Sequence, residues 1–251
     1  MTGAGRGIGR SIALALGGEG VRLALLARTE GEIGAVRDEL ARRPGHGAVI
    51  AVRCDVTDAA AVSEAIAGAE KGVGPPDILI NAAGDAISAP LVKTDEALWN
   101  HILSVNLTGT FRMIRQVAPG MIERKGGRIV NIASVAGLTG AAYIAAYSAA
   151  KHGVVGLTRA LSQELAKHGI TVNAVCPGYV ATSLTERSIA NIVQKTGMTE
   201  EQARSAIAGR SPQNRMIAPE EVAALVVHLV SDAGRGINGQ AIVLDGGGLV
   251  A

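Results

Sequence analysis

Short apolar runs alternate with longer amphipathic segments along the chain. The apolar runs are rich in Val, Ile and Leu and predict strands at 21–27, 48–53, 77–83, 127–134, 169–176 and 240–245. The longer segments predict helices at 7–19, 30–43, 57–72, 95–122, 147–168 and 219–231. This alternation indicates a parallel sheet with helices on both faces and ligands at the carboxyl ends of the strands. We therefore expect an α/β, doubly wound, Rossmann-like fold.

One segment interrupts the alternation. Residues 182–215 contain two helical stretches and no strand. Because this insertion follows the carboxyl end of a strand, it predicts a lid over a substrate. A purely structural excursion is the alternative. We expect one catalytic domain at 1–251, with 182–215 as a lid insertion.

Composition excludes several classes of protein. The net charge is +2, and the aromatic residues are one Trp, three Tyr and one Phe, which argues against nucleic-acid binding. Although 48% of the residues are hydrophobic, no apolar run approaches the ~20 residues of a membrane span, and no signal peptide is visible. The two cysteines, Cys54 and Cys176, fit a reducing compartment. We expect a cytoplasmic protein without a membrane partner.

The pair Tyr147 and Lys151 indicates a chemistry. These residues are four positions apart and so share one face of the helix predicted at 147–168. A phenol is a poor acid at neutral pH, and a nearby ammonium would lower its pKa. Ser134, at the end of a separate strand, could hold the oxygen that receives the proton. The set predicts general acid catalysis on a carbonyl or general base catalysis on an alcohol. Chance spacing on an amphipathic helix is the alternative.

A glycine-rich loop, TGAGRGIG at 2–9, directly precedes the first predicted helix. Gly3, Gly7 and Gly9 allow the backbone to approach a pyrophosphate, which would sit on the N–H groups of the helix N-terminus. The loop predicts a dinucleotide site, and a simple tight turn is the alternative.

The end of the second strand bears on the choice of cofactor. It reads Leu26-Ala27-Arg28-Thr29 and offers no carboxylate for the 2′-hydroxyl of NAD. Arg28 and Arg6 could instead bind a 2′-phosphate, so NADP(H) is preferred and NAD(H) remains possible. Both arginines could also be solvated surface residues. Asp55 and Val56, after the third strand, are expected beside the adenine.

Together these motifs resemble the classical short-chain dehydrogenase/reductase family over essentially the whole chain. ILINAAG, with Ala82 in place of an Asn, resembles the NNAG element of the family, and SVNLTG places Asn106 at the position of its catalytic asparagine. Pro177-Gly178 followed by Thr182 resembles the loop that contacts the nicotinamide amide. INGQAIVLDGG resembles the last strand, with Asn238 where threonine is commoner.

The resemblance assigns roles. It implies that Tyr147 is the proton donor, that Lys151 lowers the pKa of Tyr147 and holds the nicotinamide ribose, and that Ser134 orients the carbonyl. Asn106 would hold a water that links Lys151 to solvent, and no metal is expected. The cofactor-binding residues expected are Gly3, Arg6, Gly7, Ile8, Gly9, Arg28, Asp55, Val56, Asn81, Ala82, Gly84, Tyr147, Lys151, Pro177, Gly178, Val180 and Thr182.

Within the family, the chain looks most similar to 3-ketoacyl-thioester reductases and 3-hydroxyacyl dehydrogenases. This implies hydride transfer between NADP(H) and a carbonyl or secondary alcohol of 3-ketoacyl or polyketide type, in a homotetramer. An NAD-dependent dehydrogenase, a nucleotide-binding protein without turnover and an inert structural subunit are the alternatives. The lid carries arginines and a lysine that could bind a CoA or carrier-protein phosphate or could be solvated helix charges: Arg187, Lys195, Arg204, Arg210 and Arg215.

The chain departs from the family pattern at its start. The family has a short strand before the glycine loop, at the centre of the sheet, whereas here Met1 directly precedes Thr2. Either the start site is placed too late or the shortened chain is real. We expect a gap in the sheet and weaker support for the glycine loop.

Overall fold

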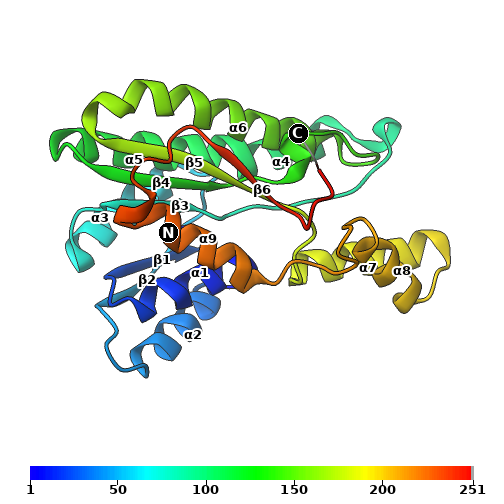
Figure 1. Ribbon diagram of the computed structural model, residues 1–251, viewed down its shortest axis with the longest axis horizontal. Helices are drawn as coiled ribbons and strands as arrows, with labels where there is room; N and C mark the ends of the chain where they lie inside the picture. The colour runs from blue at the N-terminus through cyan, green and yellow to red at the C-terminus, as the bar shows by residue number, and fades with distance from the viewer. Residues whose placement is uncertain (250–251) are drawn as a thin grey trace.

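The apolar runs pair as parallel strands in the computed structural model, which describes residues 1–249 (Figure 1). β1 pairs with β2, and β3, β4, β5 and β6 pair in that order. The strands lie within the predicted runs or one residue beyond them. Their bounds are β1 Leu23–Ala27, β2 Val49–Arg53, β3 Ile78–Asn81, β4 Gly127–Ile132, β5 Ile170–Pro177 and β6 Ala241–Leu244.

The predicted helices cover both faces of the sheet. Helices α1, α2 and α9 pack on one face, and α3, α4, α5 and α6 pack on the other. Their bounds, with those of the two lid helices, are α1 Gly7–Gly18, α2 Glu30–Ala41, α3 Ala59–Val73, α4 Glu96–Leu103, α5 Gly109–Glu123, α6 Ala145–Leu165, α7 Ser183–Thr196, α8 Glu200–Ala208 and α9 Pro219–Val230. The doubly wound α/β fold is confirmed.

Burial on both faces explains why the strands are continuous apolar runs. Leu25 belongs to the core under α1, α2 and α9, whereas its neighbour Leu26 belongs to the core under α3 and α5. Likewise, in β4, Val130 belongs to the core under α1, α2 and α9, and its neighbour Ile129 belongs to the core under α3 and α5. Successive side chains of a strand point to opposite faces, so a strand covered by helices on both sides needs an apolar residue at nearly every position.

The helix expected at 95–122 is divided. Asp95 caps α4 through a hydrogen bond from the Leu98 N–H at 2.8 Å, and a π-helical turn at Ser104–Thr108 joins α4 to α5. A π-turn inserts one extra residue and rotates the side chains that follow it. Apolar periodicity alone did not predict this turn.

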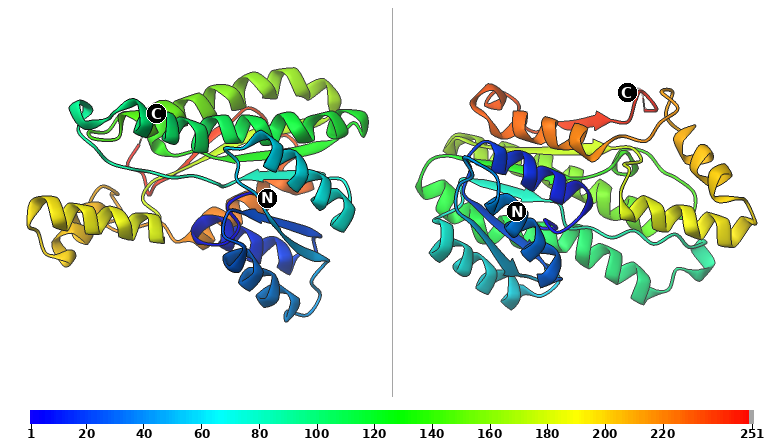
Figure 2. Two further views of the ribbon diagram at one scale, coloured as in Figure 1. Left: turned by 180° about the vertical axis from the view of Figure 1, so that it is seen from behind. Right: turned by 90° about the horizontal axis from the view of Figure 1, so that it is seen from below.

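Within the segment 182–215, the helices α7 and α8 lie outside the body formed by the sheet and its two helical layers. Figures 1 and 2 show α7 and α8 projecting beside the sheet. The two helices pack on each other around a small apolar cluster of Ile189, Ala203 and Ile207, which is separate from the two main cores. This arrangement fits an insertion, and its role as a lid stays a prediction.

The expected gap lies between β1 and β3. Within residues 1–249, Thr2 is the residue that forms β-bridges to both strands, with Leu26 of β1 and Asn81 of β3, and Met1 is bonded to β1. The Met1 nitrogen donates to the carbonyl of Ala24 at 2.7 Å, and the Thr2 N–H donates to the carbonyl of Ile80 at 2.9 Å. The glycine loop therefore still starts from residues hydrogen-bonded to both neighbouring strands.

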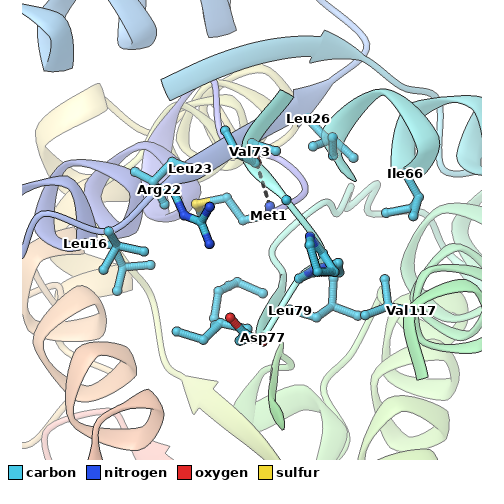
Figure 3. A pocket seen from close by; sticks show the side chains of 18 of the residues that line it. Met1, Leu16, Arg22, Leu23, Leu26, Ile66, Val73, Asp77, Leu79 and Val117 are labelled. Atoms are coloured by element: carbon cyan, nitrogen blue, oxygen red, sulfur yellow. Dashed lines mark hydrogen bonds between the residues drawn. The ribbon is translucent and has the colours of Figure 1, made fainter. Parts of the chain in front are cut away.

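A cavity of about 150 Å³ continues from Met1 toward the amino ends of β1 and β3 (Figure 3). Its walls are mostly apolar side chains from both faces of the sheet. Among them are Leu16 of α1, Ile66 of α3, Leu79 of β3 and Val117 of α5. An unfilled apolar space of this size reduces stability, since its lining side chains lose dispersion contacts.

Extending the chain ahead of Met1 by about five β-branched residues should therefore stabilise the protein. Filling 150 Å³ corresponds to roughly 4 kcal/mol at about 24 cal/mol per Å³. Each added apolar side chain would also gain about 1.5–3 kcal/mol on burial, and together these gains outweigh the roughly 5–10 kcal/mol of entropy lost in ordering five residues, so the thermal midpoint should rise by several degrees. A Gly/Ser extension of equal length is the control, and equal melting midpoints for the two extensions would contradict the prediction.

Candidate active site

A cleft of about 190 Å³ opens where the carboxyl ends of β1 to β4 meet. The glycine loop, the ends of these strands, the π-turn, α6 and the start of α7 form its walls. Many of the predicted residues line it: Gly3, Arg6, Gly7, Ile8, Gly9, Arg28, Asp55, Val56, Ala82, Gly84, Asn106, Tyr147, Lys151 and Thr182. The structure thus brings most of the predicted cofactor residues and three of the four predicted catalytic residues into one cleft.

The glycine loop is too closely packed for side chains. A Cβ on Gly9 would lie 2.0 Å from the carbonyl oxygen of Gly3, and a Cβ on Gly3 would lie 2.6 Å from the carbonyl oxygen of Ala82. Gly3 also has a φ of +65°, in the left-handed region that favours glycine. Helix α1 begins at Gly7, and the side chain of Arg6 at its N-cap makes no capping hydrogen bond. The first N–H groups of α1 therefore fit a pyrophosphate.

Asp55 brings a carboxylate to the cleft, and the charges of Arg28 and Arg53 lie nearby. The Oδ1 atom of Asp55 accepts hydrogen bonds from the N–H of Thr57 at 2.9 Å and from its hydroxyl at 2.7 Å. Burial opposes ionisation of Asp55, but the bonds from Thr57 and the nearby charges of Arg28 and Arg53 hold its pKa below the usual value. An ionised Asp55 can accept a hydrogen bond from an adenine amino group.

A phosphate that binds Arg6 has to compete with the carboxylate of Glu32. The Arg6 guanidinium pairs with Glu32 at 3.5 Å, and Glu32 also lines the cleft. The sequence analysis did not identify Glu32, which lies one turn into α2 beyond the strand end. The pair is exposed on both sides, so a 2′-phosphate could displace the carboxylate from Arg6.

Tyr147 and Lys151 meet as the spacing predicted. Lys151 is 4% exposed, and its Nζ donates to the carbonyl of Ile132 at 2.8 Å. The same Nζ lies 5.6 Å from the centroid of the Tyr147 ring. Two elements fix the ammonium, because α6 carries it and β4 supplies its acceptor.

The prediction that the pKa of Tyr147 lies below its ordinary value is wrong. Burial raises the pKa of Tyr147 to about 12, although a hydrogen bond with Ser134 opposes this rise. Burial also lowers the pKa of Lys151 to about 8. The ammonium is bonded to Ile132 and faces the tyrosine ring, so desolvation dominates both groups.

Ser134 lies at the end of β4, where the chain enters a short 3₁₀ turn at Val135–Gly137. Its Oγ accepts a hydrogen bond from the N–H of Ala136 at 3.1 Å. This bond fixes the hydroxyl on the side of Tyr147, with which it also interacts. Ser134 can therefore hold an oxygen atom beside the phenol.

Asn106 is fully buried in the π-turn. Its Nδ2 donates to the carbonyls of Ile102 and Asp85, both at 2.9 Å, and its Oδ1 accepts from the N–H of Asp85 at 3.3 Å. A Cβ on Gly84 would lie 3.0 Å from this Oδ1 and 3.7 Å from the Lys151 Nζ. Glycine at 84 leaves the space in which Asn106 and Lys151 approach each other. The water that Asn106 was expected to hold stays a prediction.

Some predicted cofactor residues lie outside the cleft lining. Asn81 is buried in β3, where its Nδ2 donates to Oδ1 of Asn131 at 2.9 Å. Val180 is also buried, and its carbonyl accepts from the Thr185 hydroxyl at 2.6 Å. Pro177 and Gly178, at the end of β5, do not line the cleft either. Their contact with a cofactor stays a prediction.

The lid cations have different environments. Arg204 pairs with Glu186 at 2.7 Å, and Arg215 pairs with Glu221 at 2.6 Å. Both pairs are exposed, as expected of solvated helix charges. Arg187 differs, because it lines the cleft and pairs with Asp85 at 2.8 Å. Asp85 was also missed by the sequence analysis, since the resemblance ended at Gly84.

The described part of the chain contains neither a candidate metal site nor a candidate membrane-spanning helix. Between residues 1 and 249, no group of three or more His, Cys, Asp or Glu side chains could hold a metal ion. None of the helices in that range is both long enough and apolar enough to span a bilayer.

Comparison with known proteins agrees with this geometry. A family model described as short chain dehydrogenase matches residues 1–192. A Streptomyces violaceoruber protein, assigned as ketoacyl reductase 1 of the granaticin polyketide synthase, is 41% identical over 249 residues, covering 98% of this chain and 91% of that protein. D-beta-hydroxybutyrate dehydrogenase of Cupriavidus necator is 36% identical, with 98% and 95% covered. A crystal structure of an actinorhodin polyketide ketoreductase variant with NADPH has a TM-score of 0.93 at 40% identity, with 98% and 94% covered.

The buried ammonium of Lys151 should make stability depend on pH. Because its pKa falls from 10.5 to about 8 on folding, the unfolded chain binds more protons between these values. This one group makes the free energy of unfolding rise with pH, by about 2 kcal/mol from about pH 8 to about pH 10, whereas Cys54 and Cys176, whose pKa values burial raises to about 11, act in the opposite direction. In urea denaturation, the difference in unfolding free energy between the wild type and Lys151→Met should therefore grow by about 2 kcal/mol over this range, because the cysteines are common to both proteins.

Tyr147→Phe is the matched control for that measurement. Since the pKa of Tyr147 is about 12, its hydroxyl stays protonated in the folded protein over the same range, and the variant should keep the growing difference from Lys151→Met. Parallel pH profiles for the wild type and Lys151→Met would contradict an ammonium buried at a cost to stability.

Proposed function

This chain belongs to the short chain dehydrogenase family and is an oxidoreductase, and we propose that it reduces the keto group of a 3-ketoacyl or polyketide substrate with NADPH. The observation that carries the proposal is the convergence of Tyr147, Lys151 and Ser134 beside a cleft that begins at a glycine loop. The names of the granaticin and actinorhodin relatives support the substrate class.

The cleft offers a partner for each main part of a dinucleotide. The open N-terminus of α1 would hold the pyrophosphate, Asp55 the adenine, and Lys151 the nicotinamide ribose. NADPH supplies the hydride when it is bound. The protein has to orient the carbonyl, exclude water and deliver a proton to the carbonyl oxygen.

Tyr147 delivers that proton. A pKa of about 12 keeps its hydroxyl protonated at neutral pH, so the donor is present in nearly every molecule. The Ser134 hydroxyl, beside the phenol, holds the substrate oxygen within reach of the same proton.

Lys151 stabilises the phenolate that forms. Its ammonium is fixed 5.6 Å from the Tyr147 ring centroid, in a site where burial strengthens the attraction between opposite charges. With a pKa near 8, Lys151 can return a proton to Tyr147 at little cost and then be recharged. Asn106, which approaches it across Gly84, is placed to hold a water for this recharging.

The choice of NADPH rests on the end of β1. Arg28 lines the cleft there, and no carboxylate occupies that strand end. Glu32 near Arg6 favours the second candidate, an NAD-dependent 3-hydroxyacyl dehydrogenase, because a carboxylate repels a 2′-phosphate. The similarity to D-beta-hydroxybutyrate dehydrogenase also supports that candidate.

Assembly and location complete the proposal. Trp99 on α4 and Phe111 on α5 are 39% and 44% exposed, and burying such apolar side chains favours a homotetramer formed through these helices and α6. A cytoplasmic location fits the two free cysteines. We also assign to residues 182–215 the role of a lid over the substrate.

Tyr147→Phe should abolish ketone reduction. Loss of the proton donor should lower kcat by about 10²-fold to 10⁴-fold, and the dissociation constant for NADPH should change little. NADPH oxidation with a panel of ketones and 3-ketoacyl thioesters measures the first quantity, and fluorescence titration measures the second. If both proteins are inactive yet bind NADPH, the chain is a nucleotide-binding protein without turnover. If neither protein binds NADPH, an inert structural subunit is favoured.

Arg28→Ala should weaken NADPH binding selectively. Losing a hydrogen bond between charged groups costs about 1.5–3 kcal/mol, which is roughly a tenfold to hundredfold rise in the dissociation constant. The dissociation constant for NADH should change by less than about twofold, because NADH lacks the phosphate. Arg42→Ala, an exposed arginine that does not line the cleft, is the control. Equal losses for NADPH and NADH in Arg28→Ala would point to the NAD-dependent candidate.

A further inference from the structure

The two lid helices, α7 and α8, have one polar side-chain connection to the body of the protein. Within residues 1–249, the side chains of α7 and α8 hydrogen-bond or ion-pair with a residue outside 180–217 at one place, the Arg187–Asp85 pair. Its Nη2–Oδ1 distance is 2.8 Å. The apolar cluster of α7 and α8 is separate from the main cores, and both helices project beside the sheet (Figures 1 and 2). The position of α7 therefore depends strongly on this pair.

Asp85 is a rigid anchor for that connection. Its backbone N–H and C=O are both hydrogen-bonded to the side-chain amide of Asn106. Its carboxylate also accepts from the N–H of Ala86 at 3.0 Å and lies 3.2 Å from Nε2 of His101 on α4. The Asp85 side chain is only 15% exposed, whereas that of Arg187 is 57% exposed. The fixed partner thus belongs to the body and the adaptable partner to the lid.

The carboxylate keeps its charge despite this burial. Burial raises the pKa of Asp85, but hydrogen bonds from His101 and Arg187 outweigh that effect and hold the pKa below its usual value. An ionised, half-buried acceptor binds a guanidinium more strongly than an exposed surface pair does.

Both members of the pair line the cleft that contains Tyr147 and Lys151. We propose that Asp85 is a positioning residue for the reaction, which latches the lid helix α7 over the catalytic end of the cleft through Arg187. The inference rests on the proposed carbonyl reduction, since a lid that excludes water and confines the substrate serves such a step. The amide of Asn106, which anchors Asp85, and the ammonium of Lys151 both lie beside Gly84, so the latch is attached to the part of the structure that surrounds the lysine.

Hydrogen exchange can test the latch without a substrate. Asp85→Asn removes the charge and keeps the backbone bonds to Asn106, and Arg187→Gln removes the other partner. Each variant should accelerate exchange in residues 183–196 by about fivefold to tenfold, as local opening becomes easier. The double variant should exchange no faster than either single variant, because the same link is lost in all three. Unchanged exchange in the single variants, or additive acceleration in the double variant, would overturn the proposal.

Kinetics supply the second measurement. Both single variants should raise KM for a ketone by about tenfold and change kcat by less than about threefold, because the latch confines the substrate and the proton donor stays in place. Arg204→Gln is the matched control: it breaks the exposed Glu186 pair within the lid and should leave KM unchanged. An equal rise in KM for Arg204→Gln would assign the effect to general lid stability and overturn the latch.

The two hypotheses fail in different ways. If the wild type reduces no ketone, the proposed function fails, and the exchange experiment still decides whether Asp85 and Arg187 hold the lid. If ketones are reduced and the variants behave as the wild type in both measurements, only the latch fails.

Discussion

A buried ammonium group needs an acceptor, and in this protein that requirement joins the sheet to the catalytic helix. The Nζ of Lys151 is held by the carbonyl of Ile132 at the end of β4, so the register of α6 on the sheet is tied to this bond. Tyr147, one turn earlier on α6, and Ser134, two residues beyond Ile132, are placed by the same contact. Burial disfavours the Lys151 ammonium, yet its hydrogen bond to Ile132 fixes the positions of Tyr147 and Ser134, the groups proposed to react.

The cost of burial is also part of the chemistry. Desolvation brings the pKa of Lys151 near 8, so the lysine is an easily recharged cation beside a tyrosine that stays protonated at neutral pH. A site exposed to water would leave the tyrosine protonated but would return the lysine to its ordinary pKa. The same dry environment strengthens the attraction between the lysine and a developing phenolate.

The sheet has its weakest point beside this site. Thr2 bridges β1 and β3 only near their carboxyl ends, and an apolar cavity follows toward the amino ends. The glycine loop is nevertheless in place, because its conformation is set by close backbone approaches such as that of Gly9 to Gly3. The catalytic groups on β4 and α6 lie on the other side of the gap, where pairing from β3 to β6 is continuous.

The sequence by itself determined the order of strands and helices along the chain and the two-sided burial, and it supplied the four positions proposed to be catalytic. Apolar periodicity and the Tyr-x-x-x-Lys spacing are local properties, and hydrophobic burial makes local patterns decide which elements form. Three features were decided only by the tertiary structure: the π-turn that orients Asn106, the desolvation that raises the pKa of Tyr147, and the meeting of Asp85 with Arg187. Asp85 and Arg187 are 102 positions apart in the chain. No local pattern encodes such a contact, because it depends on how separately specified elements pack and on how much water that packing excludes.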